Sequence, residues 1–118
     1  IIDRLQAANP NCTIFIEQIA PPKTGEFEAQ FFTIFEDFNS RIPGLAADRT
    51  DDNSRVIVVD MAEGWQDSYL SDPVHYGLTG AKIVADRYYA VMDTVLSTDR
   101  SYTILPLGDS RVEGDNGG

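Results

Sequence analysis

The stretch Arg55-Val-Ile-Val-Val-Asp60 decides the fold class of this chain. Its uninterrupted apolar residues are typical of a strand that is buried on both faces of a parallel sheet. A second strand is predicted at Thr13-Ile-Phe-Ile-Glu-Gln-Ile19, which is rich in β-branched and aromatic residues and ends at Ala20-Pro-Pro22. The apolar run at 102–107 predicts a third strand, so the chain is expected to contribute three strands to a sheet.

Helical spacing of apolar residues precedes each of these strands. Residues 1–8 fit the last turns of an amphipathic helix, and residues 26–42 predict a second helix that Pro43-Gly44 should stop. A third helix is predicted from a Thr79 cap to about Leu96. The alternation predicts an α/β fold with a parallel sheet covered by helices on both faces. One face of the second helix is expected in the core: Phe27, Phe31, Ile34, Phe35, Phe38 and Ile42.

Composition limits the classes of partner. The chain has 118 residues, 42% of them hydrophobic, which suits one small domain or part of a larger one. Nine basic and nineteen acidic residues give a net charge of −10, which disfavours binding to nucleic acid or to anionic membranes. No apolar stretch approaches the ~18 residues that a membrane span needs. A neutral substrate is therefore the expected partner.

Metal and cofactor sites are not indicated. The single cysteine, Cys12, excludes an intrachain disulfide and a cysteine-based metal site. The triplet Asn11-Cys12-Thr13 matches the glycosylation sequon, which often arises by chance. Asp48, Asp51 and Asp52 lack the spacing of a calcium loop and predict a solvated loop. No metal or organic cofactor is expected.

Three side chains suited to ester hydrolysis follow predicted strands, at the edge where open α/β sheets place functional groups. Ser110 follows the strand at 102–107, whereas Asp72 and His75, the only histidine, follow the strand at 55–60. Each signal alone is weak, but together they suit a catalytic triad. A histidine can take the proton of a serine hydroxyl, and an aspartate can orient the imidazole through Nδ1.

The same residues give the chain a resemblance to the SGNH (GDSL-type) hydrolases, which are esterases and lipases with a flavodoxin-like sheet. Ile104-Leu-Pro-Leu-Gly-Asp-Ser110 resembles the first family block, and Ala7-Ala-Asn-Pro-Asn-Cys-Thr-Ile-Phe15 is similar to the segment that enters the fourth strand. Further matches resemble the last block: Val59-Asp60-Met61, Gly64-Trp65, Asp72-Pro-Val-His75 and Gly80. The Leu-Pro-Leu-Gly-Asp-Ser version implies a secreted carbohydrate esterase that removes acetyl groups from xylan.

The resemblance implies a role for each candidate residue. Ser110 is the nucleophile and its backbone N–H is an oxyanion donor, His75 shuttles the proton, and Asp72 orients His75. Arg111, Pro73 and Tyr76 depart from the residues usual in the family, and they leave the substrate class open. The glycine of the family's second block and the asparagine of its third block, which complete the oxyanion hole, are not found in the sequence.

The order of the blocks is inverted relative to the family. Residues 1–96 resemble the C-terminal part of the domain with its fourth and fifth strands, 97–101 a connector, and 102–118 the first strand and nucleophile turn. Three explanations fit: a circular permutation, a junction of two tandem domains, or pairing with a second polypeptide that supplies the missing strands and oxyanion residues. Because the chain begins within a predicted helix, it is expected to be processed, trimmed or fragmentary.

The expected function is a serine esterase that acts on a small ester or an acetylated polysaccharide. The alternative is a non-catalytic carbohydrate-binding or structural module with the same fold. A small flavodoxin-like signalling or nucleotide domain would need a phosphate-binding glycine loop, for which Gly114–Gly118 is too short. Acyl and alcohol specificity and the oligomeric state stay open.

Overall fold

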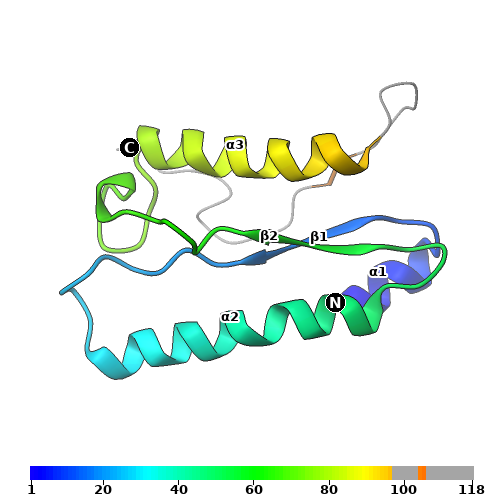
Figure 1. The fold of residues 1–118 in the computed structure, drawn as a ribbon, viewed down its shortest axis with the longest axis horizontal. Coiled ribbons are helices and arrows are strands. Elements are labelled where there is room, and N and C mark those ends of the chain that lie inside the picture. Colours follow the sequence, from blue (N-terminus) through cyan, green and yellow to red (C-terminus); the bar gives the residue numbers. More distant parts are fainter. Residues whose placement is uncertain (97–103, 106–118) are drawn as a thin grey trace. The chain divides into compact units, whose positions relative to one another are not determined.

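The computed structural model describes residues 1–96 and 104–105, which fall into two compact units. The first unit comprises Ile1–Ala20 and Ala29–Glu63, and the second comprises Pro21–Glu28 and the described residues from Gly64 onward. Helices and strands alternate along the chain (Figure 1). This alternation, together with a parallel sheet, confirms the predicted α/β class.

The sheet of the first unit consists of β1 (Ile14–Gln18) and β2 (Val56–Asp60). They pair in parallel, with the first residues of the two strands opposite each other and the last residues opposite each other. Figure 1 shows the two strands running next to each other. Backbone hydrogen bonds extend the pairing at each end, from Ile14 N–H to the Arg55 carbonyl (2.8 Å) and from Met61 N–H to the Gln18 carbonyl (2.9 Å). Both strands are confirmed to within one residue at each end.

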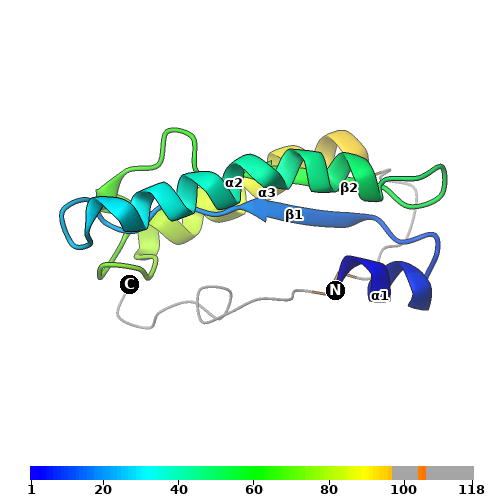
Figure 2. The ribbon, with the colours of Figure 1, turned by 90° about the horizontal axis from the view of Figure 1, so that it is seen from below.

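Two helices, α1 (Ile2–Ala8) and α2 (Ala29–Arg49), pack with the sheet of this unit. In both ribbon views α2 runs alongside the strands (Figure 1, Figure 2). Every second strand residue contributes to the shared core, as expected for side chains that alternate between two faces. The core consists of Ile2, Ala46 and Val56, with Ile14, Ile16, Leu45 and Val58 packed against it.

The prediction that the strand at 55–60, now β2, is buried on both faces is wrong. Val56 and Val59 are buried, but Ile57 and Val58 are only half-buried and Asp60 is exposed. Within the described residues the sheet has two strands, so each of them is an edge strand. A strand becomes buried on both faces only where neighbouring strands and covering helices surround it. The sequence of β2 is therefore more apolar than its partial burial among the described residues would explain.

The predicted end of the second helix at Pro43 is also wrong, because α2 begins at Ala29, continues through Pro43 and ends at Arg49. Proline has no backbone N–H, so the carbonyl of Asn39, four residues earlier, loses its helical donor. The side chain of Gln18 supplies a replacement, since its Nε2 donates to the Asn39 carbonyl at 2.9 Å. A contact with β1 thus satisfies the acceptor that the proline leaves open.

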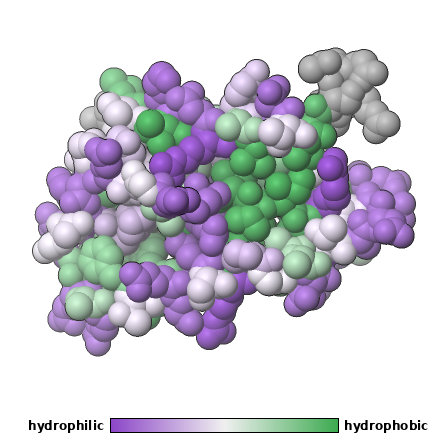
Figure 3. Space-filling model, in the orientation of Figure 1, coloured by the Kyte–Doolittle hydropathy of each residue, from purple (hydrophilic) through white to green (hydrophobic). Residues whose placement is uncertain are grey.

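The predicted apolar face of this helix lies in the core only near its C-terminal half. Ile42 and Ala46 are buried, whereas Phe31, Ile34 and Phe38 are 39%, 63% and 47% exposed. The helix residues that join the core cluster are Leu45 and Ala46, which explains why burial is confined to that half. In the space-filling view, apolar residues also reach the surface in patches among hydrophilic ones (Figure 3).

The side chain of Asn39 pairs with the backbone just beyond β1. Its Nδ2 donates to the Ile19 carbonyl (2.9 Å), and its Oδ1 accepts from the Ile19 N–H (2.8 Å). An amide side chain has the same donor and acceptor as a peptide group, so Asn39 takes the place of a neighbouring strand at this position.

Replacing Asn39 with alanine is expected to lower the free energy of unfolding by about 1–3 kcal/mol, because two backbone groups lose their partner. Urea denaturation followed by circular dichroism measures this change. Asn53→Ala, in the exposed turn before β2, is the matched control and should stay within about 0.5 kcal/mol of the wild type. Equal effects of the two substitutions would contradict a role for the Asn39 pairing.

In the second unit, a 3-10 turn (Asp67–Tyr69) precedes α3 (Leu78–Val95). The predicted cap at Thr79 is wrong, because the N-cap is Gly77 and no side chain caps the helix. The Ala81 N–H already donates to the Gly77 carbonyl at 2.8 Å, which places Thr79 inside the first turn. The end of the helix at Val95 confirms the prediction to within one residue.

The predicted third strand at 102–107 falls mainly outside the described residues. Ile104 and Leu105 are described, and both are exposed and neither is assigned to a strand. The domain boundaries at 1–96, 97–101 and 102–118 stay predictions. Among the helices of the described part, none combines the length and apolar character that crossing a bilayer requires.

Candidate active site

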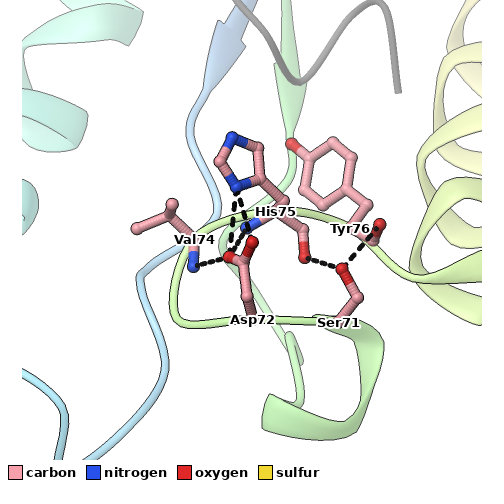
Figure 4. A network of polar contacts seen from close by, with 5 residues as sticks. All are labelled: Ser71, Asp72, Val74, His75 and Tyr76. Carbon is pink, nitrogen blue, oxygen red and sulfur yellow. Dashed lines mark hydrogen bonds and ion pairs between the residues drawn. The ribbon is translucent and has the colours of Figure 1, made fainter. Parts of the chain in front are cut away.

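Asp72 and His75 lie in a short loop of the second unit, between the 3-10 turn and α3 (Figure 4). Leu70 and Tyr76 form an antiparallel bridge across the base of this loop. The Ser71 N–H donates to the His75 carbonyl (2.8 Å), and the Ser71 hydroxyl donates weakly to the same carbonyl (3.3 Å). Backbone hydrogen bonds thus close the loop independently of the side-chain contact between Asp72 and His75.

The structure brings Asp72 and His75 into direct contact. His75 Nδ1 lies 2.8 Å from Asp72 Oδ2 and 3.1 Å from Oδ1. Asp72 Oδ1 also accepts the backbone N–H groups of Val74 and His75, each at 2.8 Å. Figure 4 shows Nε2 at the opposite side of the ring from the carboxylate. A neutral imidazole whose Nδ1 proton is held by Asp72 presents Nε2 as a proton acceptor, which is the arrangement of a general base.

Solvent can reach this pair, because the His75 side chain is 32% exposed and that of Asp72 is 41% exposed. The backbone N–H groups of Val74 and His75 lower the pKa of Asp72 from 3.8 to about 2, and the contact with the His75 ring acts in the same direction. Hydrogen bonds to the charged form of a carboxyl favour ionisation. Asp72 is therefore a carboxylate at any pH at which a histidine could serve as a base.

A pH titration tests this ionisation. The Asp72 carboxyl should titrate at about 2 in the folded chain, against 3.8 in the unfolded chain. Since the folded pKa is the lower one, the stabilising contribution is complete above 3.8 and is lost as the pH falls through about 2. Carbon-13 NMR of the carboxyl measures the midpoint. Val74→Pro, which removes one N–H donor, should raise it, and a wild-type midpoint near 3.8 would contradict the hydrogen-bonded turn.

An aromatic cluster packs beside the loop. The Trp65 ring meets that of Tyr69 nearly at right angles, with centroids 5.1 Å apart, and lies 5.3 Å from the ring of Tyr76. The guanidinium carbon of Arg87, in α3, is 6.0 Å from the Trp65 ring centroid. Tyr76 is buried and directly follows His75. The cluster therefore anchors the C-terminal end of the loop to the 3-10 turn and to α3.

Sequence reasoning did not predict every contact around the loop. The sequence indicated Trp65 and Tyr76 only as positions of a family block, and it did not predict that their rings would pack together. The stretch 23–25, for which no element was predicted, hydrogen bonds to the loop: the Lys23 N–H donates to the Pro73 carbonyl at 2.9 Å. No signal in the sequence connects these two segments.

The predicted nucleophile Ser110, with its backbone N–H and the neighbouring Arg111, lies outside the described residues. Its position relative to His75, and the role of all three triad residues, stay predictions. Among the described residues, no group of three or more histidine, cysteine, aspartate or glutamate side chains is placed to hold a metal ion.

Two solved structures are similar to this chain. One is the crystal structure of a carbohydrate esterase family 3 protein from Talaromyces cellulolyticus, and the other is that of a serine-to-alanine mutant of an acetyl esterase with an acetate ion. Each match has a TM-score of 0.68 and 23% identity, and covers 80% of this chain and 44% of the solved one. No protein-family model matches the sequence, and no curated protein matches it.

The likeness confirms the predicted α/β fold with a parallel sheet, because the elements of both solved structures superpose on most of this chain. At this identity it establishes the fold alone. The chain spans less than half the length of either structure.

Proposed function

We propose that this protein is a serine esterase in which His75 is the general base and Asp72 its orienting carboxylate. The hydrogen bond of 2.8 Å between His75 Nδ1 and Asp72 Oδ2 carries the proposal. It holds the ring with Nε2 available as the acceptor, and the lowered pKa of Asp72 keeps the carboxylate charged while the imidazole gains a proton. That the two similar folds are those of esterases supports the same chemistry.

In the proposed reaction, Ser110 Oγ attacks the ester carbonyl carbon while His75 Nε2 takes the hydroxyl proton. The backbone N–H of Ser110 donates to the oxyanion that forms on the carbonyl oxygen. Collapse of this intermediate breaks the bond to the alcohol, which leaves with the proton from His75. Water then attacks the acyl-serine by the same route, which releases the carboxylic acid and restores Ser110. This chemistry uses no cofactor.

The substrate proposed is an acetyl ester of a carbohydrate. A neutral sugar ester suits a chain with a net charge of −10, which would repel anionic substrates. One similar structure is named a carbohydrate esterase, and the other is an acetyl esterase with acetate present. Since such polysaccharides lie outside cells, we also propose that the protein is secreted.

The remaining oxyanion donors are proposed to come from a further segment, in the same or another polypeptide. The similar structures are more than twice as long as their matched parts, which supports this proposal. Each missing donor typically costs about 10²–10³ in rate, so these 118 residues alone should be a weak catalyst.

A non-catalytic carbohydrate-binding module with the same fold is the second candidate. The sequence favours it in two respects: it contains neither the glycine nor the asparagine of the oxyanion blocks, and Arg111 places a bulky cation beside Ser110.

A fluorophosphonate probe separates the two candidates, because it forms a covalent bond only with an activated serine. An esterase should be labelled at Ser110, as mass spectrometry of the peptides would show, and should hydrolyse p-nitrophenyl acetate. Ser110→Ala is the matched control and should lose both signals. If the wild-type protein shows neither labelling nor turnover, the esterase is excluded and the binding module remains.

A further inference from the structure

A tight turn in the segment Pro21–Glu28 lies against the loop that carries Asp72 and His75, within the same compact unit. The Glu26 N–H donates to the Lys23 carbonyl at 3.3 Å, and Gly25 has a φ of 84°, a conformation that favours glycine. We refer to residues 23–26 as the clasp.

Three hydrogen bonds join the clasp to the segment that follows Gly64. Asp67 Oδ1 accepts both the backbone N–H of Thr24 (3.0 Å) and its hydroxyl (3.1 Å). The Lys23 N–H donates to the Pro73 carbonyl at 2.9 Å. Because Lys23 and Thr24 are adjacent, the two bonds to Asp67 also hold the Lys23 N–H in place over Pro73.

The Pro73 carbonyl and the Val74 N–H belong to one peptide group, which is planar and turns as a unit. The clasp holds the oxygen of this group through Lys23, and Asp72 Oδ1 holds its N–H at 2.8 Å. The orientation of this plane therefore sets the direction from which the Val74 N–H donates to the Asp72 carboxylate. The same carboxylate contacts His75 Nδ1, so the clasp can influence the ring through this one peptide.

We propose that Thr24 and Asp67 are positioning residues that fix the His75 imidazole by holding the Pro73–Val74 peptide plane. In this proposal both residues act through the Pro73–Val74 peptide. The catalytic meaning of this inference rests on the proposed esterase function, whereas the effect on the ring does not.

His75 is the only histidine, so its ring nitrogens give unambiguous signals in a nitrogen-15 labelled full chain. Long-range proton–nitrogen correlation distinguishes the Nδ1–H tautomer from the Nε2–H tautomer. The wild type should show mainly Nδ1–H at a pH where the ring is neutral. In Thr24→Val and Asp67→Ala this preference should be lost, and exchange of the Val74 amide should become about fivefold faster for each hydrogen bond removed. Thr24→Ser, which keeps the hydroxyl, should restore the wild-type spectrum.

The matched control is Thr33→Val in α2, where the hydroxyl donates only to the Ala29 carbonyl of its own helix. It should leave the His75 signals unchanged. Should Asp67→Ala fail to fold, Thr24→Val decides the question, because it removes one exposed hydroxyl and keeps the backbone N–H. A wild-type tautomer and wild-type Val74 exchange in folded Thr24→Val would overturn the proposal.

Activity separates this inference from the proposed function. With an active wild type, Thr24→Val should lower kcat about tenfold while KM stays within about twofold, as expected for a misplaced base. With an inactive wild type, the esterase proposal fails, and the spectra of His75 still decide whether the clasp positions the ring.

Discussion

Replacing His75 with alanine is expected to lower the kcat of the purified protein for p-nitrophenyl acetate by about 10⁴. Without the imidazole, no group accepts the proton of the serine hydroxyl as it attacks, and the nucleophile reverts to an ordinary alcohol. KM should change little, because the ring binds the proton in transit rather than the substrate. Initial rates at saturating substrate, together with circular dichroism to verify folding, measure the effect.

Asp72→Asn should cost a similar factor by a different route. The amide oxygen can still accept from Val74 and His75, but without a negative charge it no longer favours the imidazolium or the Nδ1–H tautomer. Lys82→Ala, which removes an exposed ion pair with Asp86 on α3, is the control and should leave kcat unchanged. Should His75→Ala keep more than a tenth of the wild-type rate, the residue is not the general base.

Gly80→Ala is expected to lower the free energy of unfolding by at least about 1–3 kcal/mol, although alanine is the better helix former. A Cβ at Gly80 would overlap the carbonyl oxygen of Tyr69 and lie 2.9 Å from its carbonyl carbon, and backbone cannot move aside as a flexible side chain can. The same oxygen accepts the Gly77 N–H at 2.9 Å, so displacing it would also open the base of the loop that carries His75.

The control for Gly80→Ala is the same substitution at another helical glycine. Gly44 lies within α2, where an added Cβ would meet nothing within 4 Å. Gly44→Ala should therefore stabilise the protein by about 0.5–1 kcal/mol, because alanine loses less backbone entropy on folding. Urea denaturation of the two variants should give changes of opposite sign. Stabilisation by both substitutions would contradict the close approach of α3 to Tyr69.

Local sequence patterns predicted the helices and strands that depend on the residue types and spacing within each segment. The β-branched runs located both strands, and helical spacing located α3. The Asp-x-x-His spacing correctly indicated that Asp72 and His75 could meet, because a turn of this length returns the carboxylate to the backbone and the ring that follow it. Their catalytic roles stay predictions.

Contacts between distant segments decided what the sequence could not predict. Pro43 is tolerated because Gln18, on a strand, serves the carbonyl that proline leaves without a donor. The phenylalanines of α2 have helical spacing, yet only what packs against a helix decides which of its apolar residues are buried. Thr24 and Asp67 are 43 positions apart, and the sequence does not indicate which residue a given hydroxyl or carboxylate will contact.

The chain crosses between the two compact units at three points, near residues 20, 28 and 63, and this order constrains how the protein folds. The clasp and the His75 loop can meet only after the intervening residues 29–63 have brought their ends together, at a cost in loop-closure entropy. The helix α2 and the strand β2, which form within residues 29–63, bring the ends of this segment closer together. In refolding kinetics, the His75 signals should therefore recover no earlier than the circular dichroism of the sheet and α2. Earlier recovery would mean that the second unit forms independently.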